Sequence, residues 1–150
     1  PKSQNVMNRP PRKPSEHILS KDLQVLTVFN GLLLAVAATA LFFVTSKYFG
    51  LREARTLTVT LIVLIEAAYV QSVRELYNQK LFSNKWVVLS VIGVVLLQVI
   101  AVHTALRKIF KFTALTFQQW VYVLIIAIIV YYVSLIVSKF LSKLYEPHKR

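Results

Sequence analysis

Four long apolar blocks dominate the pattern of hydrophobic and polar positions along the chain. They cover about 23–45, 56–73, 86–102 and 119–138, and in each the apolar residues occupy all sides of a helix rather than one stripe. A helix that is apolar all round is surrounded by lipid or protein, not by water. About 20 such residues cross the roughly 30 Å hydrocarbon core of a bilayer. The pattern predicts an all-α integral membrane four-helix bundle, and Gly31 suggests close helix packing in the first block.

The polar segments around these blocks complete the predicted domain organisation. Residues 1–22 form a basic, proline-containing lead-in and residues 141–150 form a basic tail. We expect connectors at 46–55, 74–85 and 103–118, the last of which mixes bases with phenylalanines and therefore suits the membrane interface. The long polar start, which does not begin with methionine, is unlike a signal peptide. We expect the chain to begin inside a longer polypeptide.

Composition supports a membrane protein and excludes several kinds of site. Apolar residues make up 56% of the chain and charged residues only 16%, against roughly 25% in soluble domains. The absence of cysteine excludes disulfides, thiolate zinc sites and a cysteine nucleophile. The three glycines form no phosphate-binding loop, and His17, His103 and His148 are too scattered to hold a metal. We therefore expect no catalytic residue and no bound cofactor in this chain.

Basic residues flank the apolar blocks and give the chain a net charge of +12. This arrangement favours membrane lipid, not nucleic acid, as the partner of the bases. With four spans, both termini lie on one side of the membrane, and that side has twelve of the 18 bases. The six bases of the other side are Lys47, Arg52, Arg55, Arg107, Lys108 and Lys111. Because cytoplasmic segments are enriched in Lys and Arg, the bias predicts that both termini are cytoplasmic.

One carboxylate, Glu66, lies in the interior of an apolar block. The other acids of the chain lie at or outside the ends of the blocks. An acid at the bilayer centre costs a few kcal/mol on insertion scales, and the short glutamate side chain does not reach the headgroups. We therefore expect Glu66 to be buried, to face the interior of the bundle, and to be protonated, paired or bound to a cation.

The neighbours of Glu66 indicate what that partner would be. No basic residue lies mid-span to neutralise the carboxylate, which favours a proton or a metal cation. Tyr69 shares its helix face, and Gln98 and Asn30 on other spans are further possible contacts. Glu66 is thus the candidate metal ligand, with Tyr69 and Gln98 as weaker second contacts. One carboxylate cannot supply the six to eight oxygens of a calcium site, so other helices or another copy must complete it. The alternative is a protonated Glu66 that only hydrogen-bonds a neighbouring helix.

Several short motifs follow one another in a specific order. They are Met7–Asn8–Arg9–Pro10–Pro11–Arg12, then Ile65–Glu66 and Arg74, then Leu81–Phe82–Ser83–Asn84–Lys85–Trp86, then Phe110, Leu115 and Trp120. In this order and spacing they resemble the C-terminal transmembrane domain of P-type cation-transporting ATPases, in the calcium and sodium–potassium pump branch. The resemblance covers about residues 7–140. Tyr69 departs from it, because family members often have asparagine there.

The resemblance implies that residues 23–137 are the seventh to tenth helices of a pump. Glu66 would then be a ligand of the transported cation, calcium being the expected one, with further ligands on the fourth, fifth and sixth helices. The partner would be the N-terminal remainder of the pump, that is, helices one to six and the cytoplasmic domains that use ATP and Mg²⁺. The chain itself has no phosphorylatable aspartate motif and no nucleotide domain. The ATP-hydrolysing enzyme would therefore be the parent protein, not this chain alone.

Two other functions are compatible with the same residues. The chain could be a stand-alone four-span protein that binds or regulates a membrane partner, with Glu66 as a packing or proton-sensing residue. It could also form an oligomeric proton or small-cation channel lined by Glu66, although the apolar neighbours of that residue disfavour a wet path.

Overall fold

The computed structural model describes residues 21–76 and 84–145 of the 150-residue chain. The predicted lead-in at 1–22, apart from its last two residues, and parts of the predicted connector at 74–85 and of the predicted tail lie outside the described residues. The described part is entirely helical apart from short turns and connectors. Its elements are α1 (Lys21–Phe49), α2 (Leu51–Leu76), α3 (Lys85–His103), α4 (Leu106–Phe110) and α5 (Phe117–Tyr145).

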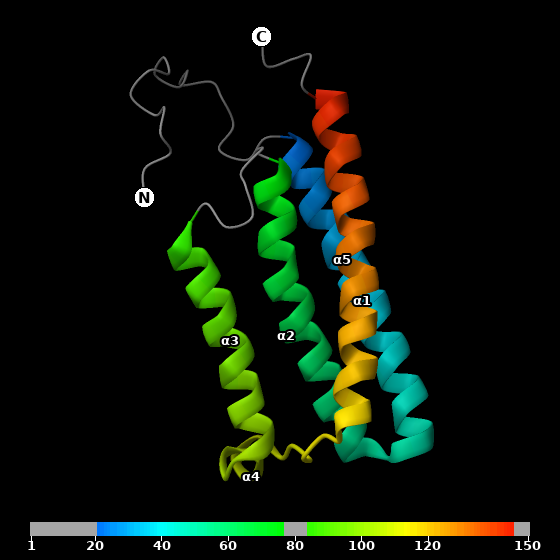
Figure 1. Ribbon diagram of the computed structural model, residues 1–150. Helices are drawn as coiled ribbons and strands as arrows, with labels where there is room; N and C mark the ends of the chain where they lie inside the picture. The colour runs from blue at the N-terminus through cyan, green and yellow to red at the C-terminus, as the bar shows by residue number, and fades with distance from the viewer. Residues whose placement is uncertain (1–20, 77–83, 146–150) are drawn as a thin grey trace.

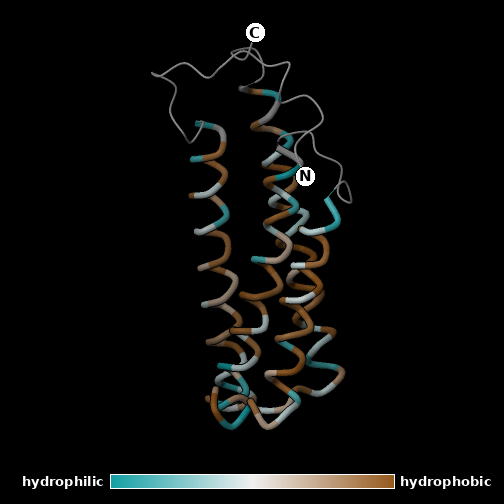
Figure 2. The backbone as a smooth tube through the Cα atoms, turned by 90° about the vertical axis from the view of Figure 1, so that its left-hand side faces the viewer, coloured by the Kyte–Doolittle hydropathy of each residue, from teal (hydrophilic) through white to brown (hydrophobic). Residues whose placement is uncertain are grey.

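Four of these helices are long and apolar enough to cross a membrane. The candidate spans are Leu23–Phe49, Leu51–Arg74, Lys85–His103 and Phe117–Leu141. Figure 2 shows mostly hydrophobic residues along the length of the helices and more hydrophilic residues towards their ends. Within lipid an α-helix satisfies its own backbone hydrogen bonds, which is why such apolar runs become helices. The predicted all-α architecture with four membrane-spanning helices is confirmed.

Three of the long helices pack closely and the fourth stands beside them. Helix α2 packs along α1, α5 and α3, and α1 also packs along α5, whereas α3 packs along α2 and the short α4 and touches α5 at its C-terminal end. Figure 1 shows α3 set apart from the group formed by α1, α2 and α5, with α4 at the end opposite to the start of α1. Helix α2 is the most buried span and α3 the least. The helix that contains Glu66 is therefore the centre of the unit.

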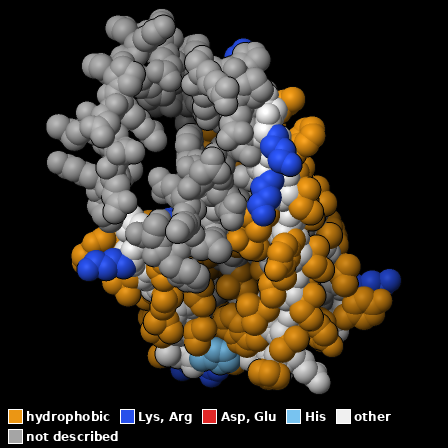
Figure 3. Space-filling model, turned by 45° about the horizontal axis from the view of Figure 1, so that its top comes forward, with side chains coloured by type: hydrophobic (Ala, Val, Ile, Leu, Met, Phe, Trp, Pro, Cys, Tyr) orange, Lys and Arg blue, Asp and Glu red, His pale blue; other side chains and the backbone are white. Residues whose placement is uncertain are grey.

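The main core lies where α2 and α5 face each other. Its buried members follow helical spacing on α2 and on α5 and include Val102 of α3 and Leu115 of the connector before α5: Leu57, Leu61, Leu64, Ile65, Val102, Leu115, Val123, Ala127 and Val130. A smaller cluster around Leu26 and Leu141 joins α1 to α5 near the other end. Around this core, exposed hydrophobic side chains cover the flanks of the described helices, with Lys and Arg gathered near the ends (Figure 3).

The turn between α1 and α2 is much shorter than the sequence predicts. The expected connector at 46–55 is wrong, because α1 continues to Phe49 and α2 begins at Leu51. Only Gly50 breaks the helices, with a φ of +89° that other L-residues rarely adopt. A helix need not end where the apolar block ends, and here both helices extend beyond it.

Replacing Gly50 with alanine is expected to destabilise the protein by about 1 kcal/mol, the cost of placing a Cβ at positive φ. A Cβ added at Gly50, Gly31 or Gly93 would have no neighbour within 4 Å in the described part of the chain, so no steric clash with these residues contributes. Gly93→Ala is the matched control, and it should be neutral or stabilising because alanine is the better helix former. Thermal unfolding in detergent measures both; equal midpoints for the two variants would contradict the argument. The same openness shows that Gly31 does not mediate close packing among these four helices, contrary to expectation.

The return from α3 to α5 is more ordered than a plain loop. At its other end, the N-terminus, α3 is capped by Asn84, whose Oδ1 accepts a hydrogen bond from the Trp86 N–H at 3.1 Å. The predicted connector at 103–118 contains the five-residue helix α4, which ends at Lys111 in the left-handed conformation with φ 56°. Beside α4, the Trp120 Nε1–H donates to His103 Nε2 at 3.0 Å, and this hydrogen bond holds the C-terminal end of α3 against the start of α5.

Candidate functional site

Glu66 lies on α2, within about 5 Å of the middle of the span Leu51–Arg74 at 1.5 Å per residue. Its side chain is exposed on the four-helix unit. The expectation that Glu66 is buried and faces the bundle interior is therefore wrong for this chain. The carboxylate lies near the middle of the span along the helix but on the side opposite to the expected one.

The packing of α2 explains this orientation. Leu57, Leu61 and Leu64 recur on one side of α2 and form its buried face. That side points at α5 and the neighbouring helices, so Glu66 is turned away from it. Val70, one helical turn further on, is also exposed. Glu66 and Val70 thus mark a face of α2 that no other described helix covers.

Tyr69 contacts α1. Its hydroxyl lies 3.0 Å from Thr27 Oγ1, so the two side chains share a hydrogen bond between α2 and α1. Asn30, also on α1, is buried and donates from Nδ2 to the Leu26 carbonyl at 2.8 Å. These contacts account for both polar groups without Glu66.

Gln98 connects α3 to α2. Its buried side-chain Nε2 donates to Thr60 Oγ1 at 2.8 Å, and Thr60 in turn donates to the Thr56 carbonyl at 2.8 Å. The Thr56 hydroxyl oxygen accepts the Thr113 N–H at 2.9 Å, which fixes the segment after α4 against α2. Sequence reasoning missed the roles of Thr56 and Thr60. Their spacing of four residues within an apolar helix is the signal that could have revealed them.

These hydrogen bonds predict that replacing Thr60 destabilises the protein more than replacing Gln98. Thr60→Val leaves the Gln98 amide buried without its acceptor and should destabilise the protein by about 1 kcal/mol, since hydrogen bonds between membrane helices are worth about 0.6 to 1.7 kcal/mol. Gln98→Leu removes the donor and leaves Thr60 bonded to the Thr56 carbonyl, so its cost should be close to zero. Thermal unfolding of the two variants in the same detergent gives the comparison. A lower midpoint for Gln98→Leu than for Thr60→Val would contradict it.

A second set of polar side chains lies between α1, α2 and α5. Ser138 Oγ donates to the Ser72 carbonyl at 3.1 Å, while the buried Oγ atoms of Ser72 and Ser134 have no hydrogen-bond partner among the described residues. Both serines line a cavity of about 10 Å³ together with Asn30 and Tyr131. This seam is polar but uncharged, and it tightens the contact of the three helices through small residues.

The described residues do not form a complete metal site. Within 21–76 and 84–145 no group of three His, Cys, Asp or Glu side chains lies close enough to hold a metal ion. Glu66 offers at most two oxygens, and the bonds of Tyr69 and Gln98 go to Thr27 and Thr60. Any cation bound at Glu66 would need most of its ligands from another part of the polypeptide.

Comparison with known proteins identifies the family. The family model of the cation-transporting ATPase C-terminus matches residues 1–140. The chain belongs to this family of cation-transporting ATPase C-terminal domains. It is 32% identical over 133 residues to the probable cation-transporting ATPase F of Mycobacterium bovis (strain ATCC BAA-935 / AF2122/97) and of Mycobacterium tuberculosis (strain ATCC 25618 / H37Rv).

The match covers 85% of this chain and 15% of each of these two relatives. The cation-transporting ATPase C-terminal domain described here is thus similar to one segment of a much longer protein. Its four apolar helices make it an integral, multi-pass membrane domain. The exposed face around Glu66 is accordingly a face that the remainder of such a protein could cover.

Proposed function

We propose that this domain is part of an ATP-driven cation pump of the calcium and sodium–potassium branch, and that Glu66 is a ligand of the transported cation. The domain would anchor the transport helices and supply one carboxylate. On the topology favoured by the charge bias, its termini are cytoplasmic.

The single observation behind this proposal is the outward orientation of Glu66 at mid-span. A carboxylate facing lipid at this depth costs a few kcal/mol, and no base in the sequence lies mid-span to compensate it. The cost disappears if other helices cover this face and a cation or proton neutralises the charge. The family match and the 15% coverage of the relatives supply the reason to expect such helices.

The chemistry of a single outward carboxylate favours a shared site. Calcium takes six to eight oxygen ligands, including carboxylates and backbone carbonyls. Glu66 would supply one or two of them, and the helices that cover α2 would supply the others. Helices one to six and the cytoplasmic domains, with ATP and Mg²⁺, are therefore the proposed partners.

ATP-dependent flux in vesicles tests the function. The native polypeptide that contains this chain is purified, reconstituted, and assayed with ATP against Ca²⁺, Na⁺, K⁺ and H⁺ separately. We expect ATP-driven calcium transport. ATP-driven movement of Na⁺ or K⁺ instead would overturn calcium as the transported cation, movement of H⁺ alone would overturn the branch assignment, and the absence of any ATP-driven flux would overturn the pump itself.

A further inference from the structure

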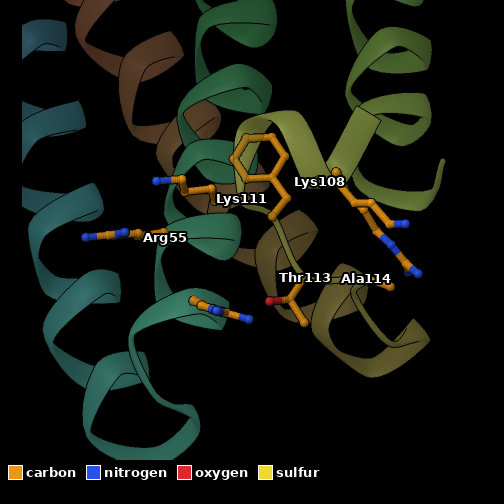
Figure 4. A pocket seen from close by; sticks show the side chains of 8 residues that line it. Arg55, Lys108, Lys111, Thr113 and Ala114 are labelled. Atoms are coloured by element: carbon orange, nitrogen blue, oxygen red, sulfur yellow. The ribbon is translucent and has the colours of Figure 1, made fainter. Parts of the chain in front are cut away.

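Five basic side chains from two distant segments line one hollow at the α4 end of the molecule. Arg52 and Arg55 lie on the first turns of α2, and Arg107, Lys108 and Lys111 lie on α4 and its C-terminal cap. The hollow has a volume of about 680 Å³ and is completed by Phe112, Thr113 and Ala114 (Figure 4). These are five of the six bases on the side of the membrane opposite the termini, so nearly all the positive charge of that side is concentrated here.

The backbone around the hollow is held in place by specific hydrogen bonds. The Thr113 N–H donates to Thr56 Oγ1 at 2.9 Å, which fixes the segment after α4 to α2. The Phe112 N–H donates to the Arg107 carbonyl at 2.8 Å and closes the end of α4, with Lys111 in the left-handed conformation. The two basic segments therefore have a fixed separation, and the hollow between them is a built feature of the fold.

Among the residues that the structure describes, no acidic side chain lines this hollow. Glu53 is the acid closest in sequence, on the first turn of α2, and it is not among the lining residues. Within the described part of the chain, none of the five bases forms an ion pair. Like charges that share a cavity repel one another. Consistent with this, Figure 4 shows Arg55 and Lys108 directed to opposite sides. A bound anion would remove the repulsion and draw the flexible side chains inwards.

The surroundings of α4 indicate what kind of anion would reach the site. Ile109 and Phe110, on the same short helix as Arg107 and Lys108, are 73% and 56% exposed. A helix with exposed apolar side chains beside basic ones is typical of the membrane interface, where apolar residues enter the acyl region and bases stay at headgroup level. The hollow would then lie at the depth of lipid phosphates.

We propose that this hollow binds the phosphate group of an anionic phospholipid. Arg52, Arg55 and Arg107 offer planar, multidentate donors suited to phosphate oxygens, and Lys108 and Lys111 add point charges. The proposal concerns the end of the domain opposite to the start of α1 and the end of α5, and it is independent of the role of Glu66. On the predicted topology, the lipid belongs to the non-cytoplasmic leaflet.

Photo-crosslinking tests this site. The native polypeptide that contains this chain is reconstituted in phosphatidylcholine nanodiscs with a small fraction of photoactivatable phosphatidylglycerol, and crosslinked peptides are mapped by mass spectrometry. We expect labelling of residues 106–114. The variant R52Q/R55Q/R107Q/K108Q should show this labelling reduced by at least about tenfold, since each basic residue near an anionic surface contributes up to about fivefold in binding.

Matched controls separate the pocket from general charge. Lys85→Gln with Lys143→Gln removes bases at the other end of the domain and should leave the labelling unchanged. Should the fourfold variant fail to fold, R107Q/K108Q alters only exposed side chains of α4 and gives the same test. Equal labelling of variant and parent, or equal labelling by photoactivatable phosphatidylcholine, would overturn the proposal.

Two further arms identify a different source of the anion. Inorganic phosphate that displaces the phosphatidylglycerol label at millimolar concentration would assign the site to a free anion instead of a lipid. Protein crosslinks between 106–114 and an acidic segment elsewhere in the polypeptide would assign it to an internal salt-bridge partner. Either result would overturn the lipid assignment.

Discussion

Replacing Glu66 with glutamine is expected to reduce the apparent cation affinity of the proposed pump by at least about tenfold. Glutamine keeps the shape and one oxygen but loses the negative charge, and even indirect partners of a metal site are worth 10–100-fold in affinity. The measurement is the cation concentration that half-saturates phosphorylation of the pump by ATP. ATP dependence at saturating cation should be unchanged, which shows that the cytoplasmic domains remain intact.

Glu53→Gln is the matched control for this experiment. It makes the same chemical change on the same helix, but in the first turn of α2 and not at mid-span. Its cation dependence should match that of the parent protein. If Glu66→Gln also has unchanged cation affinity, Glu66 is not a ligand, and a protonated, purely structural glutamate becomes the better explanation.

The sequence was sufficient to predict the helices but not where all of them end. Long blocks such as 119–138 predict a span because an apolar helix satisfies its backbone bonds within lipid. The turn around Gly50 was predicted, at 46–55, but too long, because polar residues from Ser46 to Arg55 can continue a helix beyond the hydrocarbon. Only one residue with positive φ was needed there, and hydropathy does not detect it.

The position of Glu66 along its helix could be predicted, whereas the direction of its side chain could not. The position follows from the place of the residue in the candidate span Leu51–Arg74. Direction depends on which face of α2 packs on α5, and Leu61 and Leu64 decide this only once the partners are known. The pairing of Gln98 with Thr60 was likewise unpredictable, because it depends on the register between two helices far apart in sequence.

The resemblance to a pump and the outward carboxylate strengthen one another. In the four helices alone, an exposed mid-span glutamate only adds an unfavourable free energy of membrane insertion. Placed against further helices, as we propose, the same group would serve as a shared ligand. Residues that reduce the stability of an isolated part are common where function requires them. The unfavourable effect of Glu66 on membrane insertion should therefore be measurable separately from its proposed contribution to cation binding.

The isolated second span should insert into membranes about 100-fold more favourably after Glu66→Leu. On insertion scales a carboxylate at the helix centre costs about 3 kcal/mol more than leucine, and 1.4 kcal/mol corresponds to tenfold. The measurement is the ratio of inserted to non-inserted molecules when Leu51–Leu76 is placed in a reporter whose glycosylation depends on insertion. In the intact pump the same substitution should abolish cation-dependent phosphorylation, so that insertion improves while function is lost.

Glu53→Leu provides the control for insertion, because position 53 lies close to the end of the span, where the cost of a charge is small. We expect its effect to be several-fold smaller than that of Glu66→Leu. Equal effects at the two positions would mean that Glu66 is not held at mid-bilayer depth. The proposed cation site would then lose its physical basis, because a carboxylate that reaches water requires neither a cation nor covering helices.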